Sequence, residues 1–535
     1  MNTPTNRQRE TFISCLFLCV PIALLYSLFL WNPVVFDDEY FFDGSVHHQY
    51  LDKIFSSDLR WLPYATFEWT RRLFGLDLIW FRLGNLLLHL ATAITLFLFL
   101  RRLFEQVLAN DSQNKTVLSP HWLAFFAALI FALHPVSVYA VAYLTQRTTL
   151  MATLFTLLTW RFFLEGLIRE NRVWLTASAV AYLFAALAKE HAVMAPAVCV
   201  AILLLIKNQP IRQYLKLIWP TFVLYALIGA FVVLQVKAHN VLGQSPEIMA
   251  STMIPRLGND FDNNLIYPLS IITQSFLFFK YLLLWVVPST TSMSVDMYQD
   301  FALRLWSWPQ IAGLIGFITY GFLAFYLLLQ KGLKGLLGFA LVCPWLLFFT
   351  EFSSVRIQET FVLYRSYLWM AGAFATLPFL CQKLSAKQAT WALLAVALFM
   401  TPLSLLKLKT FSHSFLLWDD AARLAERNGE YHVGMERIYY NRGVEFMQLK
   451  MYTEAIEDYT KALKLGGESS YSTSYLYQNR GVMYLKNHQY SLALSDFDKV
   501  INYQPKVSQE RLDKVIAGKT QALKEQNESN QVLEK

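Results

Sequence analysis

Long apolar runs recur along most of this chain, and they constrain its fold more than any other feature. A helix needs about 20 apolar residues to cross a bilayer, and eleven runs reach or approach that length. They lie at about 12–31, 78–100, 121–139, 145–164, 174–188, 192–206, 216–236, 309–330, 335–350, 365–382 and 388–406. The sequence therefore predicts an all-α protein, whose residues 1–406 form a polytopic membrane bundle of about 11 transmembrane helices.

Composition supports the membrane class. Of the 535 residues, 55% are hydrophobic and 16% are charged, which is more apolar surface than a soluble chain of this size can bury. The net charge of +8 fits Lys and Arg in cytoplasmic loops better than nucleic-acid binding, so no nucleic-acid partner is expected. The five cysteines fall inside or beside apolar runs, without metal-binding spacing or a disulfide framework.

A further, shorter apolar run extends from Phe276 to Val287. It carries Lys280 and is followed by Pro288. We expect it to be a re-entrant or surface-lying segment within the region 237–308 rather than a span.

The distribution of basic residues indicates an orientation. The first apolar run follows Arg7 and Arg9 and lacks a small-residue cleavage site, which indicates a retained helix with a cytoplasmic N-terminus. The loop 32–77, the region 237–308 and everything after about residue 407 then lie outside. A multi-pass protein of a bacterial inner membrane fits, with its active site and tail in the periplasm; in a eukaryote the membrane would be that of the endoplasmic reticulum.

A soluble tail follows the membrane region and contains a repeat. The stretch "YNRGVEFMQLKMYTEAIEDYTKALKLGG" from Tyr440 matches "QNRGVMYLKNHQYSLALSDFDKVINYQP" from Gln478, an offset of 38 residues. Its pattern of small and aromatic residues is typical of tetratricopeptide repeats. The tail is expected to comprise a helical linker or cap at 407–435, two repeats at 436–507, and a C-terminal helix with a frayed end at 508–535.

Such repeats most often bind other proteins, so a protein partner is expected at the tail. Asn441 and Asn479 occupy equivalent positions in the two copies. They are the candidates for the partner-binding groove.

Two adjacent acids follow the first apolar run, in the stretch "NPVVFDDEYFFDG". Asp37 and Asp38 lie where the chain leaves the membrane, among aromatic residues. Apolar residues at helical spacing from Val46 to Leu59 then predict a helix along the membrane surface, within the first outer loop 32–77. Because neighbours on an extended chain point opposite ways, only one acid of the pair is expected to reach a substrate.

Ionisable side chains of both signs also occur at the outer ends of several apolar runs, where their burial needs a reason. They are Arg60, His134, Arg147, Lys189, Glu190, His191 and Arg365. Cations at a lipid–water boundary suit a lipid-linked phosphate, and a carboxylate beside them can take a proton from an attacking hydroxyl. The combination indicates inverting glycosyl transfer from a polyprenyl-phosphate sugar, for which a single base suffices.

Several motifs follow one another in an order typical of one family. They are "FDDEYFF", "RWLPYATFEWTRRLFGLDLIWFRLGNLLLHL", "ALHPVSVYAVAYLTQRTTLMATLF", "AALAKEHAVMAPA", "LYRSYLWMAGAF" and "LLWDD". On these motifs the chain resembles the GT-C superfamily of integral-membrane glycosyltransferases, and within it the transmembrane and tetratricopeptide-repeat O-mannosyltransferases with their bacterial relatives. It departs from them in its short repeat array, in the absence of the family's proline from "YRSYLW", and in the region 237–308, which shows no match.

The resemblance implies a polyprenyl- or dolichyl-phosphate sugar donor, no obligatory metal or other cofactor, and an acid of the first outer loop as general base. Asp38 is the expected base, with Asp37 as its orienting partner. The other substrate- and phosphate-binding candidates are Arg60, His134, Arg147, Lys189, Glu190 and Arg365. The implied function is O-glycosylation of an exported protein on the outer face of the membrane.

Three alternatives remain open. A glycolipid such as lipid A could be the acceptor, although a peptide-binding tail favours a protein. A non-catalytic scaffold could present the repeats, although so many spans exceed what tethering needs. A transporter would be expected to show charges near mid-helix and internal symmetry, and neither is seen in the sequence.

Overall fold

The computed structural model describes residues 4–38, 42, 58–109, 118–207, 210–238, 243–246, 253–258, 261–429, 432–466, 473–503 and 507–533. These parts of the chain are almost entirely helical. The two short strands, β1 (Gly243–Pro246) and β2 (Ser354–Val355), pair in parallel. The all-α class is therefore confirmed; the surface helix expected between Val46 and Leu59 lies largely outside the described residues.

Among the described residues, eight helices are long and apolar enough to cross a membrane. They are α1 (Pro4–Ser27), α4 (Leu78–Leu108), α7 (Arg147–Ile168), α10 (Ile211–Ala238), α12 (Ile266–Val286), α13 (Gln310–Leu328), α14 (Gly332–Phe348) and α17 (Ala386–Thr410). A ninth span is added if α5 (Pro120–Leu133) and α6 (Pro135–Val141), bent by 64°, count as one. Two further apolar helices, α8 (Arg172–Ala188) and α9 (Ala195–Ile206), are shorter.

Two expectations about individual spans are wrong. The segment 276–287 forms the second half of α12 and the residue that caps it, and α12 as a whole is long and apolar enough to span. Its polar first half is satisfied inside the protein: Gln274, for example, donates to the carbonyl of Thr360 at 2.8 Å. The segment 365–382, expected to span, is instead a chain of short helices. They are η9 (Leu363–Arg365), α15 (Ser366–Met370), η10 (Ala371–Thr376) and α16 (Leu377–Cys381). This segment is apolar because most of it is buried within the protein.

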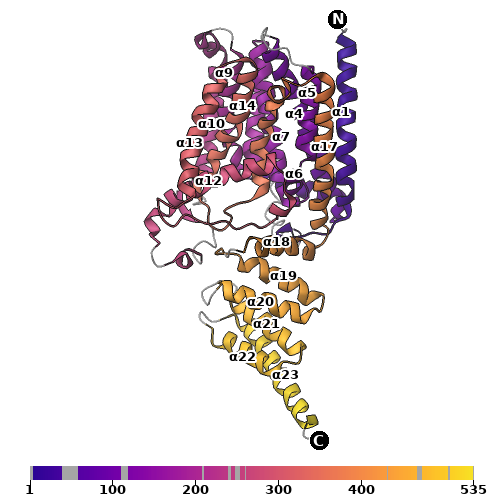
Figure 1. The fold of residues 1–535 in the computed structure, drawn as a ribbon, viewed down its shortest axis with the longest axis vertical. Helices are drawn as coiled ribbons and strands as arrows, with labels where there is room; N and C mark the ends of the chain where they lie inside the picture. The colour runs from indigo at the N-terminus through magenta and orange to yellow at the C-terminus, as the bar shows by residue number, and fades with distance from the viewer. Residues whose placement is uncertain are drawn as a thin grey trace.

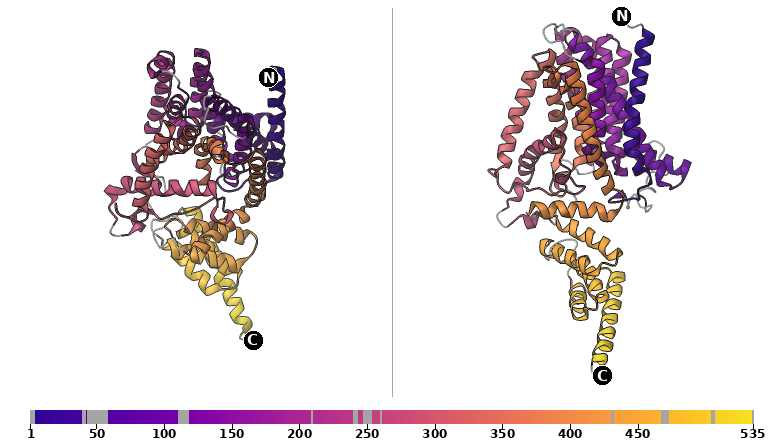
Figure 2. Two further views of the ribbon diagram at one scale, coloured as in Figure 1. Left: turned by 45° about the horizontal axis from the view of Figure 1, so that its top comes forward. Right: turned by 45° about the vertical axis from the view of Figure 1, so that its right-hand side comes forward.

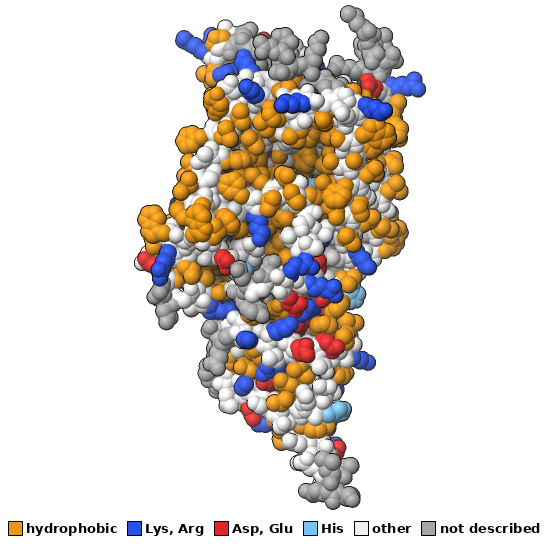
Figure 3. All heavy atoms as spheres, in the orientation of Figure 1, with side chains coloured by type: hydrophobic (Ala, Val, Ile, Leu, Met, Phe, Trp, Pro, Cys, Tyr) orange, Lys and Arg blue, Asp and Glu red, His pale blue; other side chains and the backbone are white. Residues whose placement is uncertain are grey.

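The membrane helices run side by side, and the tail lies at one end of their bundle (Figures 1 and 2). The N-terminus lies at the opposite end. On the face shown in Figure 3, hydrophobic side chains form a broad band over the bundle, whereas charged side chains of both signs are scattered over the tail. The remaining short elements connect the spans or cover their ends. They are η1 (Leu28–Trp31), α3 (Trp61–Phe74), η3 (Leu144–Gln146), η4 (Glu190–Met194), η5 (Ile254–Leu257), η6 (Asn263–Leu265), η7 (Thr290–Ser292) and η8 (Phe349–Ser353).

The tail is built from helical hairpins. Its helices are α18 (Ser414–Asn428), α19 (Glu436–Gln448), α20 (Tyr452–Gly466), α21 (Thr473–Lys486), α22 (Tyr490–Ile501) and α23 (Gln509–Leu533). A Cβ atom on Gly443 would lie 2.7 Å from the ring of Tyr459, and one on Gly481 would lie 2.9 Å from the ring of Phe497. The absence of a side chain at each glycine therefore lets the two helices of a hairpin approach closely.

The tail shares a hydrophobic core with the loops at the end of the membrane bundle. Tyr298 and Val355 of those loops are buried in one cluster with Trp418 of α18 and Ile438 of α19. Buried apolar area is the main stabilising contribution to such contacts. The first repeat is thus packed against the membrane domain at this end of the bundle.

Candidate active site

A cavity of about 630 Å³ lies among the charged residues at the tail end of the bundle. Its wall is formed by segments from several parts of the chain: the acid-bearing loop after η1, the start of α3, η3, η4, α10 and the segment from η8 to η9. The predicted residues that line it are Asp37, Arg60, Lys189, Glu190, His191 and Arg365. Segments far apart in the sequence therefore bring most of the predicted charges to one place.

The two adjacent acids occupy different environments. Asp37 lines the cavity and accepts a hydrogen bond from the hydroxyl of Tyr143 at 2.8 Å. Asp38 is fully buried, and its two carboxylate oxygens accept the backbone N–H groups of Leu144 and Thr145, both at 2.9 Å. Asp37 therefore faces the cavity and Asp38 lies in the interior, whereas Asp38 is the acid expected from the sequence to reach a substrate.

Burial raises the pKa of both acids. It raises the pKa of the Asp38 carboxyl to about 7, although the two backbone donors favour its ionised form. It also raises the pKa of Asp37, against the opposing influence of the Arg437 guanidinium and the Tyr143 hydroxyl.

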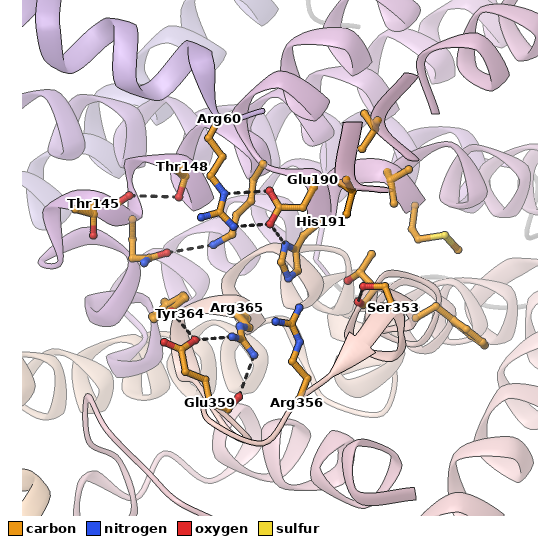
Figure 4. Close-up of a pocket in the computed structure, with 18 of the residues that line it drawn as sticks. Arg60, Thr145, Thr148, Glu190, His191, Ser353, Arg356, Glu359, Tyr364 and Arg365 are labelled. Atoms are coloured by element: carbon orange, nitrogen blue, oxygen red, sulfur yellow. Dashed lines mark hydrogen bonds and ion pairs between the residues drawn. The ribbon is translucent and has the colours of Figure 1, made fainter. Parts of the chain in front are cut away.

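Arg60 and Glu190 close one side of the cavity, where their side chains point toward each other (Figure 4). Two guanidinium nitrogens of Arg60 donate to the two carboxylate oxygens of Glu190, at 3.1 and 2.5 Å. His191 follows with Nδ1 at 3.3 Å from Glu190 and Nε2 at 3.2 Å from the buried carboxylate of Glu351. A row of ionisable side chains, in which Arg60 and His191 alternate with Glu190 and Glu351, therefore extends from the cavity rim into the bundle.

Arg365 continues this row on the opposite side of the cavity. Its Nη1 lies 3.1 Å from Glu351, and its Nη2 donates to Glu359 at 2.6 Å. Arg356 also lines the cavity, with Nε 3.5 Å from Glu351, and in Figure 4 its side chain points toward His191. The positive charges of Arg365 and Arg356 are therefore held in place by the buried Glu351, with the half-buried Glu359 as a second partner of Arg365.

Lys189 differs from the cavity arginines in having neutral partners. Its ammonium donates to the side-chain oxygens of Gln146 at 3.2 Å and Thr149 at 2.8 Å, and it lies 5.1 Å from the ring centroid of Tyr364. In the described part of the chain, no carboxylate lies within ion-pairing distance of it. Burial and the nearby Arg60 charge lower the pKa of Lys189 to about 7. This cation is therefore the one best placed to gain from an incoming anion.

Two predicted site residues lie elsewhere and need correction. Arg147 is buried outside the cavity wall, where its guanidinium donates to the side chain of Asn85 at 2.9 Å and the carbonyl of Phe81 at 2.7 Å. It holds helices together and has no access to a phosphate. His134 is also buried away from the cavity, with Nε2 3.1 Å from the carbonyl oxygen of Trp285 and Nδ1 accepting the N–H of Val136. It caps α6 at the bend after α5.

Sequence reasoning missed the contribution of the segment 349–362. Glu351, Arg356 and Glu359 all come from this polar interval between two apolar runs. Acids and bases alternate within a few positions there, just before Arg365, and that alternation could have pointed to a buried charge network.

The partner-binding residues predicted in the tail and the expectation of no obligatory metal both remain predictions. Asn441 and Asn479 are partly exposed on α19 and α21, and the side chain of Asn479 hydrogen-bonds with Tyr459. Over the described ranges, no group of three or more His, Cys, Asp or Glu side chains could hold a metal ion.

Comparison with known proteins supports the tail assignment. A family model described as Tetratricopeptide repeat matches residues 436–466, which cover α19 and α20. A search of curated proteins found no match. The chain is therefore a membrane-type helical protein with a tetratricopeptide-repeat tail.

Proposed function

We propose that this protein is an inverting glycosyltransferase that moves a sugar from a polyprenyl-phosphate donor to a hydroxyl group of an exported protein. One observation carries the proposal. A single cavity combines an accessible carboxylate, Asp37, with Lys189, a cation whose hydrogen-bond partners among the described residues are neutral.

Asp37 is the base in this proposal. The acceptor oxygen bonds to C1 of the sugar while the bond from C1 to the phosphate oxygen breaks, and the acceptor proton passes to the Asp37 carboxylate. The hydrogen bond from Tyr143 orients that carboxylate. Because the base acts from the face opposite the leaving group, the sugar configuration inverts.

The leaving polyprenyl phosphate carries the charge released by bond breaking. Lys189 can bind the phosphate oxygens without first breaking an ion pair, and Arg356 and Arg365, which line the same cavity, add positive potential. Fixed cations in a site with little water stabilise such developing charge strongly.

An apolar part of the cavity wall fits the lipid portion of the donor. Val232, Val233 and Val236 of α10 line the cavity, and α10 is among the least buried of the candidate spans. A donor could therefore keep its isoprenoid chain against α10 while its phosphate reaches Lys189.

The repeats favour a protein acceptor, because they are packed at the cavity end of the bundle and repeats of this kind commonly bind peptides. Asn441 and Asn479 are the candidate contacts within the repeat groove. In the orientation that the basic loops favour, both cavity and repeats face the periplasm.

Intact-mass analysis of exported proteins tests this function in cells that carry the wild type, Lys189→Gln, or no copy of the gene. The proposal expects a hexose- or pentose-sized mass to be lost from one or more proteins in the deletion and to be reduced in the variant. A change confined to glycolipid masses would show a glycolipid acceptor, and no change in either class would contradict the transferase.

A further inference from the structure

The first repeat helix reaches the turn that carries the catalytic acid. Arg437, the second residue of α19, places its guanidinium carbon 5.0 Å from the ring centroid of Phe36. The same carbon lies 6.0 Å from the ring of Trp418 in the linker helix α18. Its Nε is 3.4 Å from a carboxylate oxygen of Asp296 in the loop after α12.

The turn itself has an uncommon backbone conformation. Phe36 has a φ of 60°, which is rare for a bulky residue and persists where surrounding contacts enforce it. Its ring packs against Tyr143 and Trp418, each at a centroid distance of 5.4 Å, and under Arg437. Two of these three contacts come from the tail, although the turn belongs to the membrane domain.

Asp37 is the next residue, and several charged or titratable groups act on it. Arg437 faces it from α19, Tyr143 from the turn between α6 and η3, and Glu359 and Tyr364 from the segment before α15. Asp296 adds negative charge nearby, and Asp38 is the next residue in the chain. Arg437 is the group that most strongly opposes the effect of burial on Asp37.

We propose that Arg437 is a positioning residue, through which the docked repeat domain holds the Phe36–Asp37 turn in the conformation needed for catalysis. The tail would then complete the active centre, in addition to any part in acceptor binding. This inference rests on the proposed function, because it takes Asp37 as the base.

Donor turnover by the purified full-length protein tests the inference. The donor is the polyprenyl-phosphate hexose or pentose that the mass analysis identifies. For Arg437→Gln we expect kcat to fall by about ten- to a hundredfold, the size of effect that misplacing a catalytic group produces, with little change in the donor KM. The acid limb of the pH–rate profile should move to higher pH. Arg437→Lys should restore part of the lost kcat and reverse part of the shift of the acid limb.

Arg480→Gln is the matched control. Arg480 pairs with Asp496 at 2.7 Å inside the second repeat, as Arg442 pairs with Asp458 in the first. The control should leave the acid limb in place. An Arg437→Gln enzyme with the wild-type kcat and acid limb would overturn the inference.

A second measurement does not depend on activity. Thermal unfolding of the wild type, Arg437→Gln, Asp37→Asn and the double variant forms a cycle that reports the coupling between the two residues. We expect Arg437→Gln to lower Tm less when Asp37 is already Asn. If the Tm losses of the two single variants simply add in the double variant, the inference is overturned. A wild-type protein that is inactive with every donor would contradict only the proposed function.

Discussion

Asp37 and Asp38 are neighbours in the chain, yet their carboxylates lie in separate environments: the first lines the cavity and the second accepts two backbone N–H groups in the interior. Phe36, whose φ is 60°, turns the backbone just before these two acids. The pair therefore combines one acid that can meet a substrate with one that fixes the loop against η3.

The first prediction concerns Asp38 and the pH dependence of stability. Its pKa is about 7 in the folded protein and about 4 in an unfolded chain. The folded state therefore binds more protons than the unfolded state between these values, so the contribution of Asp38 to stability falls as pH rises from about 4 to 7. Asp38→Asn removes this dependence and leaves one N–H poorly paired. Its Tm deficit relative to the wild type should be larger at pH 5 than at pH 8; parallel Tm curves would contradict the assignment.

Lys189 gives a prediction for the pH dependence of activity. In the proposed function its ammonium binds the donor phosphate, and a pKa of about 7 means that this charge is lost as pH rises through neutrality. The alkaline limb of kcat/KM should therefore lie near pH 7 in the wild type and move upward in Lys189→Arg. Lys189→Gln should raise the donor KM by about tenfold or more, as loss of a charge-assisted contact predicts. Arg147→Lys is the control: it should lower Tm without moving the alkaline limb.

Glu351 is expected to be the most important carboxylate for stability in the charge network. It is fully buried and lies near His191, Arg356 and Arg365. Because Glu351→Gln leaves buried cations without their shared partner, we expect a loss of about 3–5 kcal/mol in the free energy of unfolding. Glu510→Gln, which removes an exposed pair with Lys514, should cause no measurable change. Equal Tm values for the two variants would contradict this account of the network.

The contact between the repeats and the membrane domain depends on Gly434. Its φ is +103°, and a Cβ atom there would lie 2.3 Å from the ring of Tyr298. Gly434→Ala should displace the first repeat, which we expect to accelerate proteolysis around the linker and to reduce transfer. Gly429→Ala is a close control, since its φ is +68° but no atom lies within 4 Å of the added Cβ. Similar digestion rates for the two variants would show that the close approach is unimportant.

The sequence predicts those features that depend on local pattern. Apolar runs indicate the membrane helices, the 38-residue offset indicates the repeats, and charges at helix ends indicate Lys189 and Arg365. It does not distinguish Lys189 from Arg147, because the partners that occupy Arg147 come from α4, far away in the chain. It also does not show which acid of the pair faces the cavity, because that depends on the turn at Phe36. The network around Glu351 depends on three-dimensional contacts among η4, η8 and η9.

The most direct test compares Asp37→Asn with Asp38→Asn in the purified full-length protein in lipid vesicles. Release of polyprenyl phosphate is followed with the donor sugar that the mass analysis identifies. Loss of a general base costs about 10²–10⁴-fold in rate, so Asp37→Asn should lose at least a hundredfold in turnover while it melts close to the wild-type temperature. Asp38→Asn should instead lower Tm and retain more turnover than Asp37→Asn. Wild-type turnover in Asp37→Asn would contradict the central claim that this carboxylate is the base of a sugar transfer.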